Sequence, residues 1–222
     1  MSKEIFLEKF RRNERVIFLS DGVFAIVLTL LILDIKLPPS LPDDISASEL
    51  WQQVKALKHH FLSFLLSFVF IINIWFTHNQ LLKAFEKVDN AMVWLNNLLL
   101  LMTCVIPFPT ALIGQYFDNP IGIIFLGSIL VFIPLVIYSI ATLGYKRRYL
   151  SVHFDLHRIH FLRKSLLFIS LFSAIPLTFA WFMPRLAFSF YMVRLIVGVV
   201  LSSMVKVKDR SVTGHLHNLQ GK

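Results

Sequence analysis

The chain is poor in cysteine and in charge. Its 222 residues include one cysteine, Cys104, so the chain cannot form an internal disulfide. Charged residues make up 16% of the sequence and hydrophobic residues 56%, with 22 phenylalanines. This composition excludes an ordinary soluble domain of this length and indicates an integral membrane protein.

The sequence also lacks the short alternating apolar segments, about ten residues each, that build transmembrane barrels. Its apolar runs are long enough to cross roughly 30 Å of hydrocarbon as helices. We therefore predict an all-α fold, an integral membrane bundle of six transmembrane helices that forms a single domain over residues 1–222. The predicted helices span about 16–36, 61–82, 91–114, 121–144, 165–183 and 186–205.

Lysine and arginine outnumber aspartate and glutamate by 22 to 13, a balance that could suggest a nucleic-acid ligand. The position of the charges argues against that interpretation. If both termini are cytoplasmic, 17 of the 22 basic residues lie in inner segments, which is the positive-inside pattern. We therefore predict a multi-pass plasma-membrane protein with both termini in the cytoplasm, in contact with the lipid bilayer and with no nucleic-acid partner.

The segments between the predicted helices carry three further signals. A short surface helix is expected from Glu49 to Leu57, beginning at Ser48. The longest inner loop, 145–164, contains Lys146-Arg147-Arg148, which we expect to meet anionic lipid headgroups. Prolines inside the predicted spans are expected to kink a helix, mark a hinge or be accommodated by packing; they are Pro107, Pro109, Pro134 and Pro176.

The first predicted helix carries polar residues near its inner end, where an unpaired charge costs roughly 3 kcal/mol or more. The second predicted helix ends with three polar or amphipathic side chains at i, i+3 and i+4, which share one face. The topology puts both sets at the same depth, so we predict a structural network of hydrogen bonds between them. A proton relay through Asp21 and His78 remains the alternative. The predicted network comprises Arg15, Ser20, Asp21, Trp75, His78 and Asn79.

At 100° per residue, Ile26, Leu30 and Leu33 fall on one stripe of the first helix, with Gly22 one turn below and Thr29 at its border. Asp21 points away from this stripe. On spacing alone, the stripe could be an ordinary packing face.

The run Arg-Val-Ile-Phe-Leu-Ser-Asp at 15–21 resembles the Arg-x-x-x-Phe-Ser-Asp signature that opens the transmembrane protein 175 family of potassium channels. Trp75 and His78-Asn79 resemble the second motif of that family. Leu19 stands where the family usually has phenylalanine, a change that keeps bulk but loses a ring. The six-helix length matches the bacterial members over nearly the whole chain.

The resemblance implies a homotetramer whose four first helices line a central pore for passive, weakly selective flow of potassium and other monovalent cations. It implies apolar rings at Ile26, Leu30 and Leu33 as constriction and gate, in place of a carbonyl selectivity filter. It also assigns Thr29 a polar contact with the permeating ion. Asp34, near the outer mouth, could raise the local cation concentration. We expect no cofactor, no metal site and no enzyme activity.

Two other classes of protein remain open. One is a proton-coupled secondary transporter using Asp21 and His78, although the sequence shows no internal repeat of the kind transporters usually have. The other is a non-conducting membrane scaffold.

His153, His157 and His160 have the i, i+4, i+7 spacing that could place a metal on one helical face. The basic residues of the same loop disfavour cation binding there.

Arg194 lies in the middle of the last predicted span, and one arginine does not make a voltage sensor. We expect it to form a buried pair or to bind carbonyl oxygens.

Overall fold

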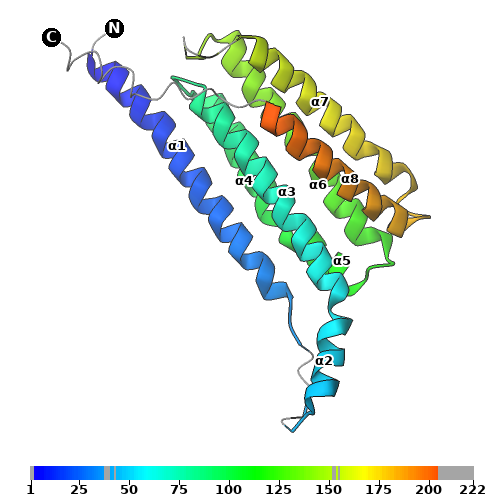
Figure 1. Cartoon of the computed structure of the whole chain (residues 1–222). Coiled ribbons are helices and arrows are strands. Elements are labelled where there is room, and N and C mark those ends of the chain that lie inside the picture. Colours follow the sequence, from blue (N-terminus) through cyan, green and yellow to red (C-terminus); the bar gives the residue numbers. More distant parts are fainter. Residues whose placement is uncertain (1–2, 38–40, 43, 152–153, 155, 205–222) are drawn as a thin grey trace, which may run out of the picture.

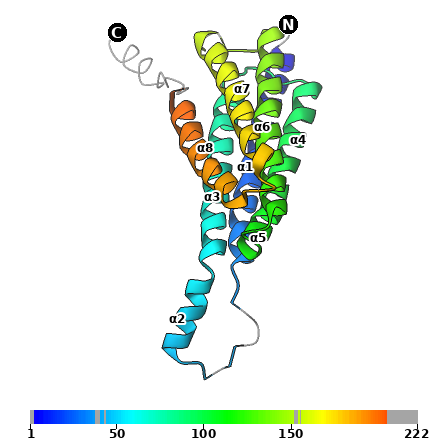
Figure 2. The same ribbon diagram turned by 90° about the vertical axis from the view of Figure 1, so that its right-hand side faces the viewer.

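The computed structural model describes residues 3–37, 41–42, 44–151, 154 and 156–204. Within them, six helical segments are long and apolar enough to cross a membrane, in agreement with the predicted all-helical membrane bundle. The helices run side by side along most of their length (Figures 1 and 2). The elements are α1 (Lys3–Leu30), η1 (Leu31–Asp34), α2 (Ala47–Ala56), α3 (Lys58–Lys83), α4 (Asn90–Val105), α5 (Pro107–Gln115), α6 (Pro120–Lys146), α7 (Leu156–Phe179) and α8 (Pro184–Met204).

Two of the helices begin well before their apolar runs. The first helix was predicted to start near residue 16, but α1 begins at Lys3. Likewise α7 begins at Leu156, inside the predicted inner loop 145–164, whereas the fifth predicted helix begins at 165. Arginine, lysine, glutamate and leucine are good helix formers, so the polar flanks continue each helix beyond its membrane-spanning part.

The third predicted span consists of two helices. We predicted one helix over 91–114, whereas α4 ends at Val105 and α5 begins at Pro107. Pro107 has no N–H and its ring clashes with the preceding turn, so it fits the first turn of a new helix. Pro134 and Pro176, by contrast, lie inside the uninterrupted helices α6 and α7.

The short helix α2 lies beyond the predicted outer end of the bundle, joined to α3 (Figure 2). Ser46, rather than the predicted Ser48, caps it: the Ser46 side chain accepts the Glu49 N–H, and the Glu49 carboxylate accepts the Ser46 N–H at 3.1 Å. The hydrogen bonds from Ser46 hold the pKa of Glu49 below its ordinary value. The helix has no buried residue.

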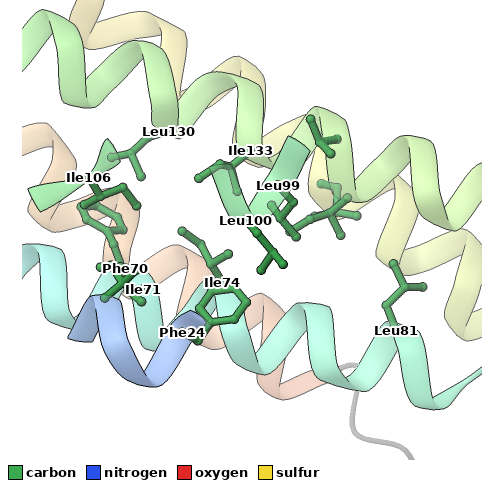
Figure 3. Close-up of a cluster of buried hydrophobic side chains, with 14 of the residues drawn as sticks. Phe24, Phe70, Ile71, Ile74, Leu81, Leu99, Leu100, Ile106, Leu130 and Ile133 are labelled. Carbon is green, nitrogen blue, oxygen red and sulfur yellow. The ribbon is translucent and has the colours of Figure 1, made fainter. Parts of the chain in front are cut away.

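The bundle core lies between α3, α4 and α6, and α1 packs on one side of it. Figure 3 shows Phe24 of α1 reaching the side chains of Ile74 on α3 and Leu100 on α4, all at most 5% exposed. Leu130 and Ile133 of α6 close the far side of the cluster. Because lipid is as apolar as these side chains, close van der Waals packing rather than burial from water holds the helices together.

Candidate functional site

The helix α1 has one covered face and one uncovered face. Four apolar side chains on the covered face are at most 8% exposed and pack in the main core. This face contacts α3 and α4, and α1 lies at the edge of the bundle (Figure 1). The covered apolar residues are Val16, Phe24 and Val27 of α1, and Leu31 of η1, which continues α1.

A buried polar cluster ties α1 to α3 and α4. Asn96 Nδ2 on α4 donates to Ser20 Oγ at 3.2 Å. Nε2 of His78 on α3 lies 2.6 Å from Asn96 Oδ1. All three residues are 1% exposed. Ser20 also donates to the Val16 carbonyl at 2.8 Å. Asn96 therefore links the two predicted polar sets through a third helix.

A second cluster surrounds Asp21 one residue further along α1. Trp75 Nε1 donates to Asp21 Oδ1 at 2.7 Å, and Asn79 Nδ2 donates to the same oxygen at 3.2 Å. Within the described residues no hydrogen bond joins Asp21 to His78. The structure thus brings the predicted polar residues of α1 and α3 together in two adjacent clusters rather than one. Arg15 is the exception, since it bonds to neither cluster within the described residues.

Sequence reasoning missed two residues that hold α1. Asn96 stands beside Asn97 in an apolar run, and that amide pair was the available signal. Asn13 is 7% exposed and donates from Nδ2 to the carbonyl of Phe85 at 2.8 Å and of Leu82 at 3.3 Å. It therefore fastens the polar part of α1 to the end of α3, a role that no motif indicated.

The predicted pore stripe lies on the uncovered face of α1 and continues onto η1, which holds Leu33. Ile26, Leu30 and Leu33 are 60%, 45% and 57% exposed. A Cβ added at Gly22 would meet no atom within 4 Å. Thr29 is exposed, and its hydroxyl donates to the Ile26 carbonyl at 2.8 Å. No other part of the described chain covers this stripe.

Two further predicted residues lie near the ends of the same segment. Arg15 is exposed and has no hydrogen bond or ion pair with any described residue. Asp34 is the last residue of η1, and its side chain lies outside the described residues. The structure therefore places Arg15 near one end of the uncovered stripe and the backbone of Asp34 near the other.

Arg194 is 3% exposed and contacts three other helices. Its Nε donates to Ser173 Oγ at 2.8 Å, and its Nη2 donates to the Leu130 carbonyl at 3.3 Å. Its guanidinium also lies 4.7 Å from the centre of the Phe70 ring. A carbonyl, a hydroxyl and an aromatic face thus hold this cation inside the bundle, which is one of the two arrangements expected from the sequence.

The predicted histidine set does not form a metal site within the described residues. His157 and His160 lie on α7, and the ring of His160 meets the edge of Tyr145 at 5.0 Å between centroids. His153 lies outside the described residues. No group of three histidine, cysteine, aspartate or glutamate side chains in the described part of the chain could hold a metal ion.

Comparison with known proteins gives consistent matches over the elements that build both polar clusters. Residues 15–107 match the family model described as endosomal/lysosomal potassium channel TMEM175. A potassium channel of Chamaesiphon minutus is 37% identical over 106 residues, which are 48% of this chain and 51% of that protein. A potassium channel of Streptomyces collinus is 38% identical over 102 residues, 46% of this chain and 48% of that protein. The chain therefore spans about half the length of these curated relatives.

A vertebrate relative and a solved structure extend the comparison. The human endosomal/lysosomal proton channel TMEM175 is 40% identical over 91 residues, 39% of this chain and 18% of that protein. The crystal structure of a lysosomal potassium-selective channel TMEM175 homolog from Chamaesiphon minutus superposes with a TM-score of 0.76 and 25% identity. It covers 86% of this chain and 98% of that one. Over residues 15–107 the chain is similar to the TMEM175 family of potassium channels, and its fold is that of the TMEM175 homolog from Chamaesiphon minutus.

Proposed function

We propose that this chain is the subunit of a passive, potassium-preferring cation channel in a bacterial plasma membrane. Four copies would place the uncovered face of α1 around a central pathway, with both termini in the cytoplasm. The observation that carries the proposal is the contrast between the two faces of α1, since Ile26 is 60% exposed while Val27, its neighbour, is 2% exposed. Bacterial relatives named as potassium channels support the choice of ion.

The apolar stripe has the chemistry of a gate that works by wetting. Rings of Ile26, Leu30 and Leu33 would exclude water when narrow, and an ion that loses its hydration shell in an apolar ring does not pass. A small outward tilt of α1 would widen the ring and admit water. Thr29 uses its hydroxyl proton on the Ile26 carbonyl, so its oxygen lone pairs would face a partly hydrated cation.

The polar clusters would anchor the gate and not carry ions. Ser20 and Asp21 lie on the flank of α1 that meets α3 and α4, where Asp21 bonds Trp75 and Ser20 bonds Asn96. His78 of α3 bonds the same Asn96. Removing a partner from such a buried network leaves unsatisfied groups, so the network fixes the rotation of α1. Asp34 at the opposite end would attract cations to the mouth.

A proton-coupled carrier using Asp21 and His78 is the second candidate, because both side chains are of types that can carry protons and they belong to the two adjacent polar clusters of α1 and α3. Vertebrate relatives are named as proton channels. The experiment therefore measures both ions. Purified protein is reconstituted in liposomes, and flux is followed under a potassium gradient and, separately, under a proton gradient.

We expect potassium flux from the native chain and a large change in that flux when Ile26→Asn or Leu30→Asn makes the stripe polar. Phe132→Asn is the matched control, since Phe132 is 56% exposed on α6 and lies off the proposed pathway. Unchanged flux in both α1 variants would refute the pore stripe. Crosslinking that yields monomers alone would refute the tetramer. Proton flux without potassium flux, abolished by Asp21→Asn, would establish the carrier instead.

A further inference from the structure

The turn between α6 and α7 borders a half-open cavity of about 520 Å³. It lies at the end of the bundle where the N-terminus is found (Figure 1), which is the predicted cytoplasmic end. Its volume falls in the range of roughly 300–1,000 Å³ typical of ligand sites. The cavity is lined by two cationic and several apolar side chains, among them Lys146, Arg148, Leu150, Phe154 and Leu156.

Arg148 adopts a backbone conformation that side chains rarely take. Its φ is 56°, the one positive value among the described non-glycine residues. Helices often end with a residue in this conformation. That residue is usually glycine, because a Cβ is disfavoured there. The turn is nevertheless fixed, since Tyr149 N donates to the Gly144 carbonyl and Glu86 N to the Tyr149 carbonyl, both at 2.9 Å. An arginine held in a glycine conformation beside a cavity points to a use for its side chain.

The three consecutive cations of this turn have different surroundings. Arg147 forms an ion pair with Asp89 and does not line the cavity. Lys146 and Arg148 line it, are exposed, and have no hydrogen bond or ion pair with any described residue. The sequence suggested that all three cations meet lipid headgroups together, but in the structure only Lys146 and Arg148 line this cavity.

We propose that this cavity binds the phosphate of an anionic phospholipid, held by Lys146 and Arg148. Leu150, Phe154 and Leu156 would contact the glycerol and the first methylenes of the acyl chains. A lipid fits better than a soluble anion because the cavity joins the end of one membrane span, α6, to the start of the next, α7. Leu156, the first residue of α7, is 58% exposed there. Basic pockets between membrane helices at the cytoplasmic side are suited to such headgroups.

The test uses Arg148→Gly, which removes the cation and at the same time relieves the backbone conformation. The purified protein in detergent is titrated with dioctanoyl phosphatidylglycerol, and the thermal unfolding midpoint is recorded. Dioctanoyl phosphatidylcholine and inorganic phosphate are titrated separately. A ligand that binds the folded state raises the midpoint with its concentration.

We expect phosphatidylglycerol alone to raise the midpoint of the native chain. Arg148→Gly should unfold at the same or a higher temperature without lipid. Its apparent affinity for phosphatidylglycerol should fall at least about tenfold, as expected for a lost charge-assisted contact. Lys146→Gln should weaken binding in the same direction. Lys164→Gln is the control, because it removes an exposed charge from α7 that does not line the cavity.

Three results would overturn the proposal. An equal response to phosphatidylcholine would mean that the headgroup charge is not recognised. An equal loss of affinity in Lys164→Gln would reduce the effect to net charge. A response to inorganic phosphate as strong as that to the lipid would make the cavity a site for free anions. None of these depends on ion conduction, so the result is independent of the proposed channel function.

Discussion

The helices α1 and α6 are almost equally apolar, yet they are covered very differently. In the most apolar 18-residue stretch of each span, 28% of the α1 residues and 56% of the α6 residues are buried within the chain. α6 packs against α4, α5, α7 and α8, whereas α1 lies at the edge of the bundle (Figure 1) and leaves Ile26 and Leu30 exposed. Hydropathy therefore identifies a membrane span but does not tell what covers it.

The polar residues make the same distinction. The described part of α6 has no acidic side chain. Its hydroxyls at Ser128 and Ser139 bond to carbonyls of their own helix, and only near its C-terminal end do Tyr138 and Thr142 accept hydrogen bonds from Arg163 of α7. α1 instead uses Ser20 and Asp21 to bond α3 and α4. A helix in the middle of a bundle is positioned by neighbours on all sides, but a helix at the edge needs specific bonds to fix its rotation.

The largest difference is expected between alanine substitutions at two glycines. A Cβ at Gly127 of α6 would overlap the Tyr191 hydroxyl and a methyl of Leu177. Gly127→Ala should therefore cost about 3 kcal/mol of folding free energy through overpacking. The methyl group added by Gly22→Ala on α1 meets no atom within 4 Å, so this substitution should raise the free energy of unfolding by up to about 1 kcal/mol through helix propensity. Denaturation in detergent measures both, and similar losses at the two sites would break the comparison.

Asp21 is the next most sensitive position. Asp21→Ala removes the acceptor for Trp75 and Asn79, and should cost about 2 kcal/mol because charged hydrogen bonds are lost. Asp21→Asn keeps one acceptor oxygen and should cost less. Thermal unfolding and crosslinking of the assembled protein measure the effect. Full stability of Asp21→Asn together with lost proton dependence of transport would favour the relay over the structural network.

Asn96→Leu tests the buried link between α1, α3 and α4. It leaves the His78 ring without its partner, and should cost about 1–2 kcal/mol. Ser20 retains its bond to the Val16 carbonyl, which limits the loss. The control is Asn97→Leu, one residue further and only half-buried, where a change below about 0.5 kcal/mol is expected. Equal losses from the two substitutions would remove Asn96 from its proposed role.

The smallest effect is expected where α6 begins. Arg185 donates to both oxygens of Asp118 at 2.6 and 2.8 Å, and these bonds hold the Asp118 pKa below its ordinary value. The stabilisation is therefore present above the ordinary aspartate pKa and is lost as the pH falls. Because the pair is exposed, Arg185→Gln should leave thermal stability at neutral pH unchanged within error. It should also raise the Asp118 pKa, as followed by carboxyl NMR; a large loss of stability would show that α6 depends on surface charge.

The number of spans follows from run length, but the sequence could not place every boundary. Polar residues end an apolar run without ending a helix, which is why α1 and α7 begin earlier than predicted. The sequence could not predict the break between α4 and α5 at Ile106, because a proline can either start a new helix or lie inside a continuous one. Pro107 does the first and Pro134 the second, although both lie in apolar surroundings.

The candidate site was predictable in part. Spacing along one helix separates the stripe of Ile26 from the flank of Asp21, because the angle per residue is fixed. Whether Asn96 or Asn97 turns inward depends on how α4 is rotated against α1, which no local pattern specifies. The partners of Arg194 come from three other helices, so they too become visible only in the assembled bundle.

The central claim is that the uncovered face of α1 lines an ion pathway, and cysteine accessibility tests it most directly. Cys104 is the one native cysteine, so Cys104→Ser provides a clean background. Leu30→Cys and Phe132→Cys are each added, and potassium flux into liposomes is measured before and after a charged, water-soluble methanethiosulfonate reagent. The account predicts that the reagent blocks flux through Leu30→Cys and leaves Phe132→Cys unaffected. Flux through Leu30→Cys that persists unchanged after confirmed modification would contradict it.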